Sequence, residues 1–142
     1  MKAENITTQN GAIKIYYAHH LWKYGTPIEQ YELNIIKKAF PDAEIFNPST
    51  DIPRGLQDDE AMILCIDALS GCNALVFSDL SGVVGKGVME EIETANKDRK
   101  PVFRIRDNRL FQSAIGFERI ESNSRRLHAI VKEIEKADKS NA

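Results

Sequence analysis

This chain of 142 residues has little cysteine, almost no excess of charge of either sign, and no long apolar run. Its formal net charge of -2 gives no electrostatic reason to expect a nucleic acid or an anionic membrane as partner. The apolar runs are far shorter than the ~20 residues that a membrane-spanning helix needs. Residues 1–11 are polar and contain no apolar signal-peptide core, so we interpret them as a flexible tail of a cytoplasmic protein.

Cys65 and Cys72 are the only cysteines, and they lie seven residues apart in one predicted helix. This spacing favours two free thiols in the core over a disulfide bridge, which is typical of a reducing compartment. The sequence contains no CxxC pattern and no suitably spaced histidine partner. We therefore expect neither a metal site nor another bound cofactor.

Short apolar runs alternate with longer amphipathic stretches along the chain, with no repeat or linker to divide them. This alternation predicts a single α/β domain over residues 12–138. We expect a flavodoxin/Rossmann-like doubly wound fold, in which a mostly parallel sheet of four to five strands is flanked by helices on both faces. Our expected strand order is 2-1-3-4-5. The predicted strands are 12–17, 43–46, 74–77, 101–105 and 117–120, and the predicted helices are 27–40, 58–71, 87–97 and 124–136.

The first of these helices has a marked start signal. Thr26 is the predicted N-cap, Pro27 occupies the first helical position, and Glu29 completes a capping box.

Ligands of doubly wound sheets bind beyond the carboxyl ends of the strands, where the strand order reverses. The segments 18–25, 47–56 and 78–87 should therefore meet there. His19 is a candidate for binding phosphate or acting as an acid, or it simply packs on a neighbour. Asn47 is either a polar ligand contact or part of a plain turn, and Ser78 is a further candidate contact.

A glycine-bearing segment over residues 78–87 joins a buried strand to a helix. Gly85, Lys86 and Gly87 stand at its end, where backbone N–H groups and the helix dipole favour an anion or an ionised carboxylate. The other interpretation is a flexible turn. At ~100° per residue, Glu91 falls on the border of the buried face, whereas Glu90 and Glu93 point toward solvent.

Three stretches resemble the nucleoside 2-deoxyribosyltransferase superfamily. They are Gly-Val-Met-Glu-Glu-Ile-Glu-Thr-Ala at 87–95 followed by Lys-Pro-Val at 100–102, Ile-Tyr-Tyr-Ala at 15–18, and Leu-Ser-Gly-Cys-Asn-Ala-Leu-Val at 69–76. Together they cover about residues 13–105. The order and spacing of these motifs carry the resemblance more than any one of them does.

The resemblance implies a role for several residues. Glu91 matches the family nucleophile, which attacks the anomeric carbon of a nucleoside or nucleotide and displaces the base. Tyr16 matches a tyrosine that hydrogen-bonds to this nucleophile and orients it. Gly85, Lys86 and Gly87 then line the sugar or phosphate side. The family also assembles as dimers or larger homo-oligomers, so we expect the same here.

The sequence departs from the family pattern at two acidic positions. Cys65 stands where the family usually has an aspartate, and Gly85 aligns with the acid that protonates the leaving base. Asp67 falls on the solvent face of its helix and is rejected as a replacement, whereas Asp58 lies on the same stripe as Cys65 and is a candidate substitute.

These departures leave three hypotheses. The leading one is an enzyme, either a transferase or a hydrolase, that breaks the N-glycosidic bond of a nucleoside or nucleotide through Glu91. The second is a non-catalytic nucleotide-binding or sensing domain on the same fold. A phosphoribohydrolase-type enzyme fits less well, because the chain lacks that family's consecutive glycines.

Overall fold

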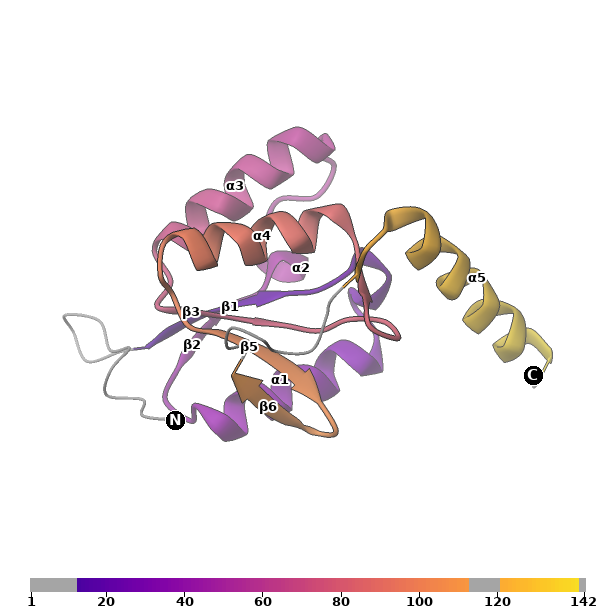
Figure 1. Ribbon diagram of the computed structural model, residues 1–142, viewed down its shortest axis with the longest axis horizontal. Coiled ribbons are helices and arrows are strands. Elements are labelled where there is room, and N and C mark those ends of the chain that lie inside the picture. Colours follow the sequence, from indigo (N-terminus) through magenta and orange to yellow (C-terminus); the bar gives the residue numbers. More distant parts are fainter. Residues whose placement is uncertain (1–12, 113–120, 141–142) are drawn as a thin grey trace.

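The computed structural model describes residues 13–112 and 121–140. The tail expected at 1–11 and the strand expected at 117–120 lie outside the described residues. Strands, helices and one short 3-10 helix (η2) alternate along the chain, as Figure 1 shows. In chain order the elements are β1 (Lys14–Ala18), η2 (Leu21–Lys23), α1 (Pro27–Ala39), β2 (Glu44–Phe46), α2 (Pro48–Asp51), α3 (Asp58–Ser70), β3 (Ala74–Phe77), β4 (Val83–Val84), α4 (Lys86–Lys97), β5 (Val102–Arg106), β6 (Arg109–Gln112), β7 (Glu121–Ser122) and α5 (Ser124–Ser140).

The main sheet has five strands in the order β2-β1-β3-β5-β6. The pairs β1–β2, β1–β3 and β3–β5 are parallel, so the first four expected strands have the expected order 2-1-3-4 of a Rossmann-like α/β fold. The fifth strand differs from expectation, because β6 is antiparallel to β5 and follows it directly. Asp107 and Asn108 both adopt positive φ, which is the backbone of the two-residue turns that favour a tight hairpin.

Successive residues of β1 face opposite layers, because side chains alternate along a strand. Tyr16 belongs to the core cluster that packs against α3 and α4, whereas Tyr17 belongs to the cluster packed against α1. In Figure 1, α3 and α4 lie over one face of the sheet and α1 lies under the other. The helices on both faces confirm the doubly wound arrangement, and they place the two tyrosine hydroxyls on opposite sides of the sheet.

The start of α1 differs from the expected capping box. Thr26 is the N-cap as expected, and its Oγ1 accepts the Glu29 backbone N–H at 3.3 Å. The reciprocal bond to the Thr26 backbone is absent here, because the Glu29 carboxylate accepts the Gly25 N–H at 3.2 Å and contacts His19 instead. Glu29 is therefore drawn into the segment between β1 and α1, and is only 6% exposed.

The segment after β2 is more ordered than the expected loop. Residues 48–51 form the single turn α2, and Asn47 is its N-cap, with its Oδ1 accepting the Ser49 N–H at 3.0 Å. The Asn47 N–H donates to the carboxylate of Asp51 at 2.8 Å. This reciprocal pair fixes the direction in which the chain leaves β2.

The C-terminal helix α5 extends from one end of the molecule (Figure 1). It is held at its start, where Ser124 Oγ accepts the Lys86 N–H at 3.1 Å and the side chain of Leu127 is buried. Across the part of the chain that the structure describes, no helix combines the length and apolar character needed to cross a membrane.

Candidate active site

A cleft of about 460 Å³ opens beside the segments that follow β1 and β2. This volume lies in the ordinary range of small-molecule pockets. The cleft is lined by Leu21, Tyr24, Gly25, Pro48, Ser49, Ile52, Pro53, Arg54, Gly55, Leu56, Asp58, Ala61 and Cys65. Two of the three segments expected to meet, 18–25 and 47–56, thus form its walls, and α3 supplies the rest.

Tyr16 and Glu91 meet in the core between β1 and α4. The Tyr16 hydroxyl donates a hydrogen bond to Glu91 Oε2, although the two residues are 75 positions apart in the sequence. Glu91 is only 6% exposed, so it is more deeply buried than the half-shielded position that helical geometry indicated. Glu90 and Glu93 are exposed, as expected. The contact follows from the side-chain periods of the two elements. Alternation along β1 turns Tyr16 toward α3 and α4, and the helical turn of α4 places Glu91 on its buried face.

Burial controls the protonation of this carboxylate. It raises the pKa of Glu91 to about 7, while the Tyr16 hydrogen bond opposes that rise and the charge of Glu90 adds to it. Burial also raises the pKa of Tyr16, so its phenol remains a hydrogen-bond donor. Near neutral pH, Glu91 is therefore divided between its acid and its carboxylate form.

Glu91 is not among the residues that line the cleft, but its charge raises the pKa values of two residues that are, Cys65 and Tyr24. Burial raises the pKa of Cys65, the Tyr16 hydroxyl opposes this rise, and the charge of Glu91 adds to it. Burial likewise raises the pKa of Tyr24, and the carboxylates of Glu91 and Glu29 raise it further. Tyr24 is therefore within electrostatic reach of two buried carboxylates, one on each side of the sheet.

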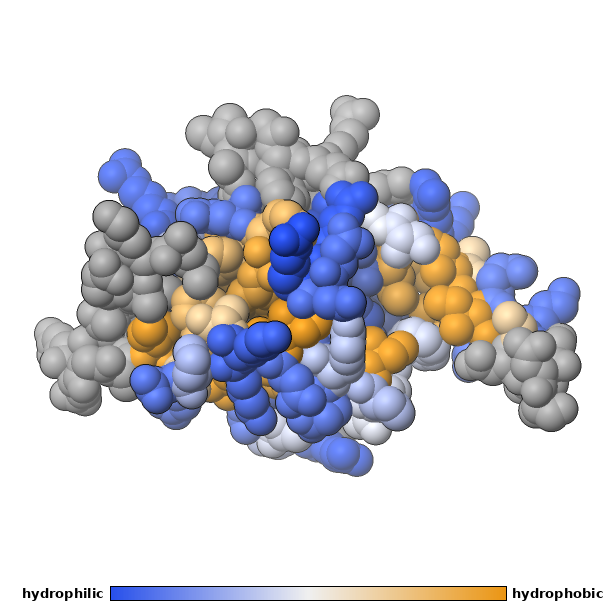
Figure 2. All heavy atoms as spheres, turned by 90° about the horizontal axis from the view of Figure 1, so that it is seen from below, coloured by the Kyte–Doolittle hydropathy of each residue, from blue (hydrophilic) through white to orange (hydrophobic). Residues whose placement is uncertain are grey.

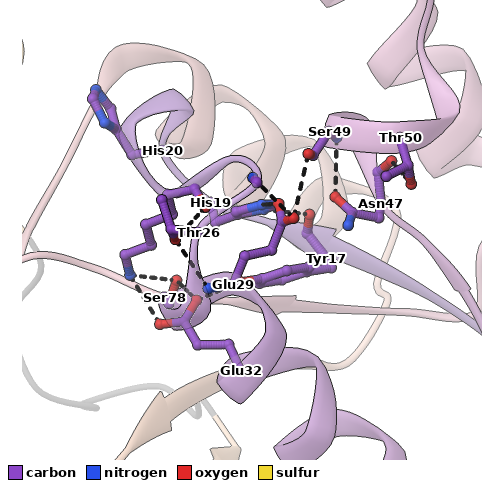
Figure 3. Close-up of polar contacts among 12 residues, drawn as sticks. Tyr17, His19, His20, Thr26, Glu29, Glu32, Asn47, Ser49, Thr50 and Ser78 are labelled. Atoms are coloured by element: carbon purple, nitrogen blue, oxygen red, sulfur yellow. Dashed lines mark hydrogen bonds and ion pairs between the residues drawn. The ribbon is translucent and has the colours of Figure 1, made fainter.

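A second polar cluster lies at the end of β1 and is drawn in Figure 3. His19 is 4% exposed, and its ring stacks on that of Tyr17 at a centroid distance of 3.7 Å. Its Nδ1 lies 3.2 Å from the Tyr17 carbonyl oxygen, and its Nε2 lies 2.7 Å from Glu29 Oε2. Burial alone would raise the pKa of Glu29, but hydrogen bonds from His19, Gly25 and Ser49 together hold it below its usual range.

A third cluster joins η2, α1 and the end of β3. Lys23 Nζ donates to Glu32 Oε2 at 2.9 Å, to Ser78 Oγ at 2.8 Å and to the Asp79 carbonyl at 3.1 Å. Ser78 donates in turn to Glu32 Oε1 at 2.7 Å, and Tyr17 donates to the same oxygen. These bonds use all three ammonium hydrogens and both carboxylate oxygens. Ser78 is thus buried in a structural network rather than facing the cleft.

The other predicted site residues have separate places. Asp58 is exposed and lines the cleft at the start of α3. Asn47 is buried as the cap of α2. Gly85 lies under α5, where an added Cβ would stand 3.3 Å from Leu127 Cδ2. Lys86 is exposed, and Gly87 faces Met62 of α3, whose Cε would be 3.1 Å from an added Cβ.

A larger hollow of about 540 Å³ lies between α1 and the β5–β6 turn. On the face shown in Figure 2, apolar surface alternates with hydrophilic side chains. The polar residues that line the hollow are exposed: Tyr31, Asn34, Lys38, Asn108 and Arg109. The cleft, in contrast, adjoins buried ionisable groups. Because perturbed ionisable groups beside a pocket mark functional sites, we place the candidate site at the cleft.

Sequence reasoning missed Glu29 as a site residue, and it also missed Lys23 and Glu32. The signal was present, since Glu29 and Glu32 stand seven and four positions before the buried Ile36 and share its face of α1. Two acids on the apolar stripe of a helix indicate buried polar partners.

In the described ranges 13–112 and 121–140, no group of three or more His, Cys, Asp or Glu side chains is arranged to hold a metal ion. Comparison of the chain with protein-family models, curated proteins and solved structures gives no match. The functional argument therefore depends on the geometry of the cleft and on the buried groups around it.

Proposed function

We propose that this protein breaks the N-glycosidic bond of a nucleoside or nucleotide, with Glu91 as the nucleophile. The hydrogen bond from Tyr16 to Glu91 supports this proposal most directly. The sequence resemblance pairs a strand tyrosine with a helix glutamate, and these two side chains make that contact across 75 residues.

The environment of Glu91 suits covalent catalysis. A carboxylate attacks the anomeric carbon, the bond to the base breaks, and the bonding pair leaves with the base; water or an acceptor base then releases the sugar. The buried position desolvates the carboxylate, and Tyr16 fixes the direction of Oε2. Cys65 and Tyr24, whose pKa values the charge of Glu91 raises, line a cleft whose apolar and polar lining suits the face of a base and a sugar.

The proposal is tested by chromatographic measurement of free base released from nucleosides, deoxynucleosides and their monophosphates. We expect release by the wild type and a loss of at least about a thousandfold in Glu91→Gln. Glu93→Gln is the matched control, because Glu93 is exposed on the same helix. Activity that survives Glu91→Gln would remove Glu91 from the mechanism.

A non-catalytic nucleotide-binding domain is the second candidate. It is favoured by the absence of an acid at Cys65 and Gly85, where the resemblance leads us to expect one. A ligand that raises thermal stability without any turnover, in wild type and Glu91→Gln alike, would support this alternative.

The functional unit in this proposal is a homodimer or a larger homo-oligomer. Leu21, which lines the cleft, is 67% exposed, and Ile63 elsewhere on α3 is 68% exposed, so apolar side chains are open to a second copy. Light scattering that gives a monomer mass at working concentration would contradict this part of the proposal.

A further inference from the structure

Helix α1 carries apolar side chains on a face that is turned away from the core. Its buried residues are Glu29, Glu32 and Ile36, and two of these are acids. Tyr31 and Ile35 lie four positions apart, so they share another side of the helix. Tyr31 is 49% exposed, and Ile35 is only partly buried. An apolar stripe outside the buried face of a surface helix indicates a second contact on that side.

This stripe forms one wall of the hollow of about 540 Å³ between α1 and the β5–β6 turn. Leu110 of the adjacent strand β6 supplies apolar surface on the other wall. The Tyr31 hydroxyl donates to Asn108 Oδ1, and this bond ties the helix to the turn. Figure 2 shows this side of the molecule, where apolar surface lies between hydrophilic side chains. The volume and the two apolar walls suit the body of a small molecule.

Two cations line the same hollow, Lys38 from α1 and Arg109 from the start of β6. Both are exposed, and neither forms a salt bridge with a residue in the ranges 13–112 and 121–140. The hairpin register pairs Arg106 with Arg109, which adds a third cation nearby, while Asp107 in the turn is the neighbouring acid. No carboxylate is among the lining residues that the structure describes, so the charge inside the hollow is positive.

We propose that this hollow binds an amphiphilic organic anion, which has a flat apolar body and one carboxylate, sulfonate or phosphate group. The body packs between the α1 stripe and Leu110, and the anionic group binds Lys38 and Arg109, because a guanidinium matches the shape of such groups. A second copy is a poorer occupant, since a two-fold contact would place the same cations of both copies against each other. The hollow and the cleft have no described lining residue in common, so this site lies beyond the proposed function.

Two fluorescent probes with nearly the same body test the role of charge. 8-Anilinonaphthalene-1-sulfonate is an anion, and N-phenyl-1-naphthylamine has the same ring framework without the sulfonate. In the double variant Lys38→Gln, Arg109→Gln, we expect the Kd of the anion to rise about tenfold, because two charged contacts are lost, and the Kd of the neutral probe to change less than about twofold. Lys37→Gln is the matched control, since Lys37 is exposed on the same helix outside the hollow, and it should change neither Kd by more than about twofold.

Tryptophan substitutions test the location of the probes. Asn34→Trp fills the hollow from an exposed position of α1, and it should raise the Kd of both probes by at least about tenfold. Gln30→Trp is the matched control, because Gln30 is exposed one turn away and does not line the hollow. Ala61→Trp, which fills the cleft, should leave both Kd values unchanged.

Binding that survives Asn34→Trp, or that Ala61→Trp removes, would place the probes elsewhere and overturn the proposal. Equal effects on the two probes in the Lys38–Arg109 double variant would overturn it too, as would no measurable binding of the anion to wild type. If a second copy occupies the hollow instead, the Kd of the anion should rise with protein concentration, which contradicts the proposal as well. These titrations are independent of base release by wild type and Glu91→Gln, so either proposal can fail without the other.

Discussion

At the scale of single residues, the Tyr16 hydroxyl opposes the effect of burial on the protonation of Glu91. Its hydrogen bond lowers the pKa of Glu91 against the effect of burial. A hydrogen bond to a charged group contributes about 1.5–3 kcal/mol, so Tyr16→Phe should raise the pKa of Glu91 by roughly one to two units. Because the nucleophile must be ionised, the acidic limb of the pH–rate profile should move to higher pH by the same amount.

Tyr17→Phe is the matched control for this measurement. It removes a hydroxyl from the neighbouring residue of β1, but that hydroxyl binds Glu32 on the other side of the sheet. An acidic limb that stays in place in Tyr16→Phe, or that moves equally in both variants, would show that the Tyr16 contact does not tune the nucleophile.

The same carboxylate should weaken the fold as the pH rises. Its pKa is raised from 4.5 to about 7, so the folded state is favoured while Glu91 is protonated and loses stability as pH rises through about 7. Glutamine resembles the neutral acid. Glu91→Gln should therefore be more stable than wild type by about 3 kcal/mol at pH 8 and by less than about 1 kcal/mol at pH 5.

Urea unfolding at the two pH values measures this difference, with Glu93→Gln as the exposed control. A Glu91→Gln variant that is less stable than wild type at pH 8 would mean that the ionised carboxylate is well solvated in the folded protein, contrary to its burial.

The sequence indicated some of these residues but not their partners. The helical period alone distinguished the buried Glu91 from the exposed Glu90, because buried positions recur with each helical turn. The partners of Glu29 lie 10 and 20 residues away, in His19 and Ser49, and only the folded chain brings them together. The capping-box motif already explained a glutamate at position 29. The sequence therefore gave no reason to expect that Glu29 also has tertiary partners.

At the scale of elements, the Lys23–Glu32 pair joins η2 to α1 and to the end of β3. Lys23 is 2% exposed and Glu32 is 7% exposed, so neither charge is solvated. Removing one partner of a buried pair costs about 3–5 kcal/mol, because the other charge stays buried. Lys23→Met should lower the free energy of unfolding by about that amount, and adding Glu32→Gln should recover part of the loss.

Chemical denaturation of the two single variants and the double variant gives the coupling directly. Lys37→Met, at an exposed position of α1, is the control and should change stability by no more than about 0.5 kcal/mol. Strictly additive effects would show that the two side chains do not act as a pair.

The order of the elements was predictable because each has its own local signal. Buried strands are short apolar runs, and α1 has both an N-cap and Pro27 at its first position. The strand β6 was missed because its sequence signal is a turn rather than an apolar run. Asp107 and Asn108, between the segments Val102–Arg106 and Arg109–Gln112, are residue types that tolerate positive φ. That pair was the available sign of a hairpin.

At the scale of the whole molecule, the cleft joins parts of the chain that are distant in sequence. Its walls come from the segment after β1, the segment after β2, and α3. Two of its lining residues, Gly25 and Ser49, donate to the buried Glu29 of α1. Cys65, a third, shares a core cluster with Tyr16, the partner of Glu91 in α4. A ligand in the cleft should therefore stabilise the domain as a unit, because opening either wall would expose its contacts to water.

This coupling predicts the response of the intact protein to ligand. With the nucleoside or nucleotide found in the base-release screen, Glu91→Gln binds without turnover, and saturation at about 100 Kd should add about 2.7 kcal/mol of stability. For a chain of this size, that corresponds to a rise in Tm of roughly 8 °C. Ala61→Trp, combined with Glu91→Gln, fills the cleft from its α3 wall and should abolish the rise. An equal rise in the plugged protein would place the ligand outside the cleft, and would separate Glu91 from any substrate bound there.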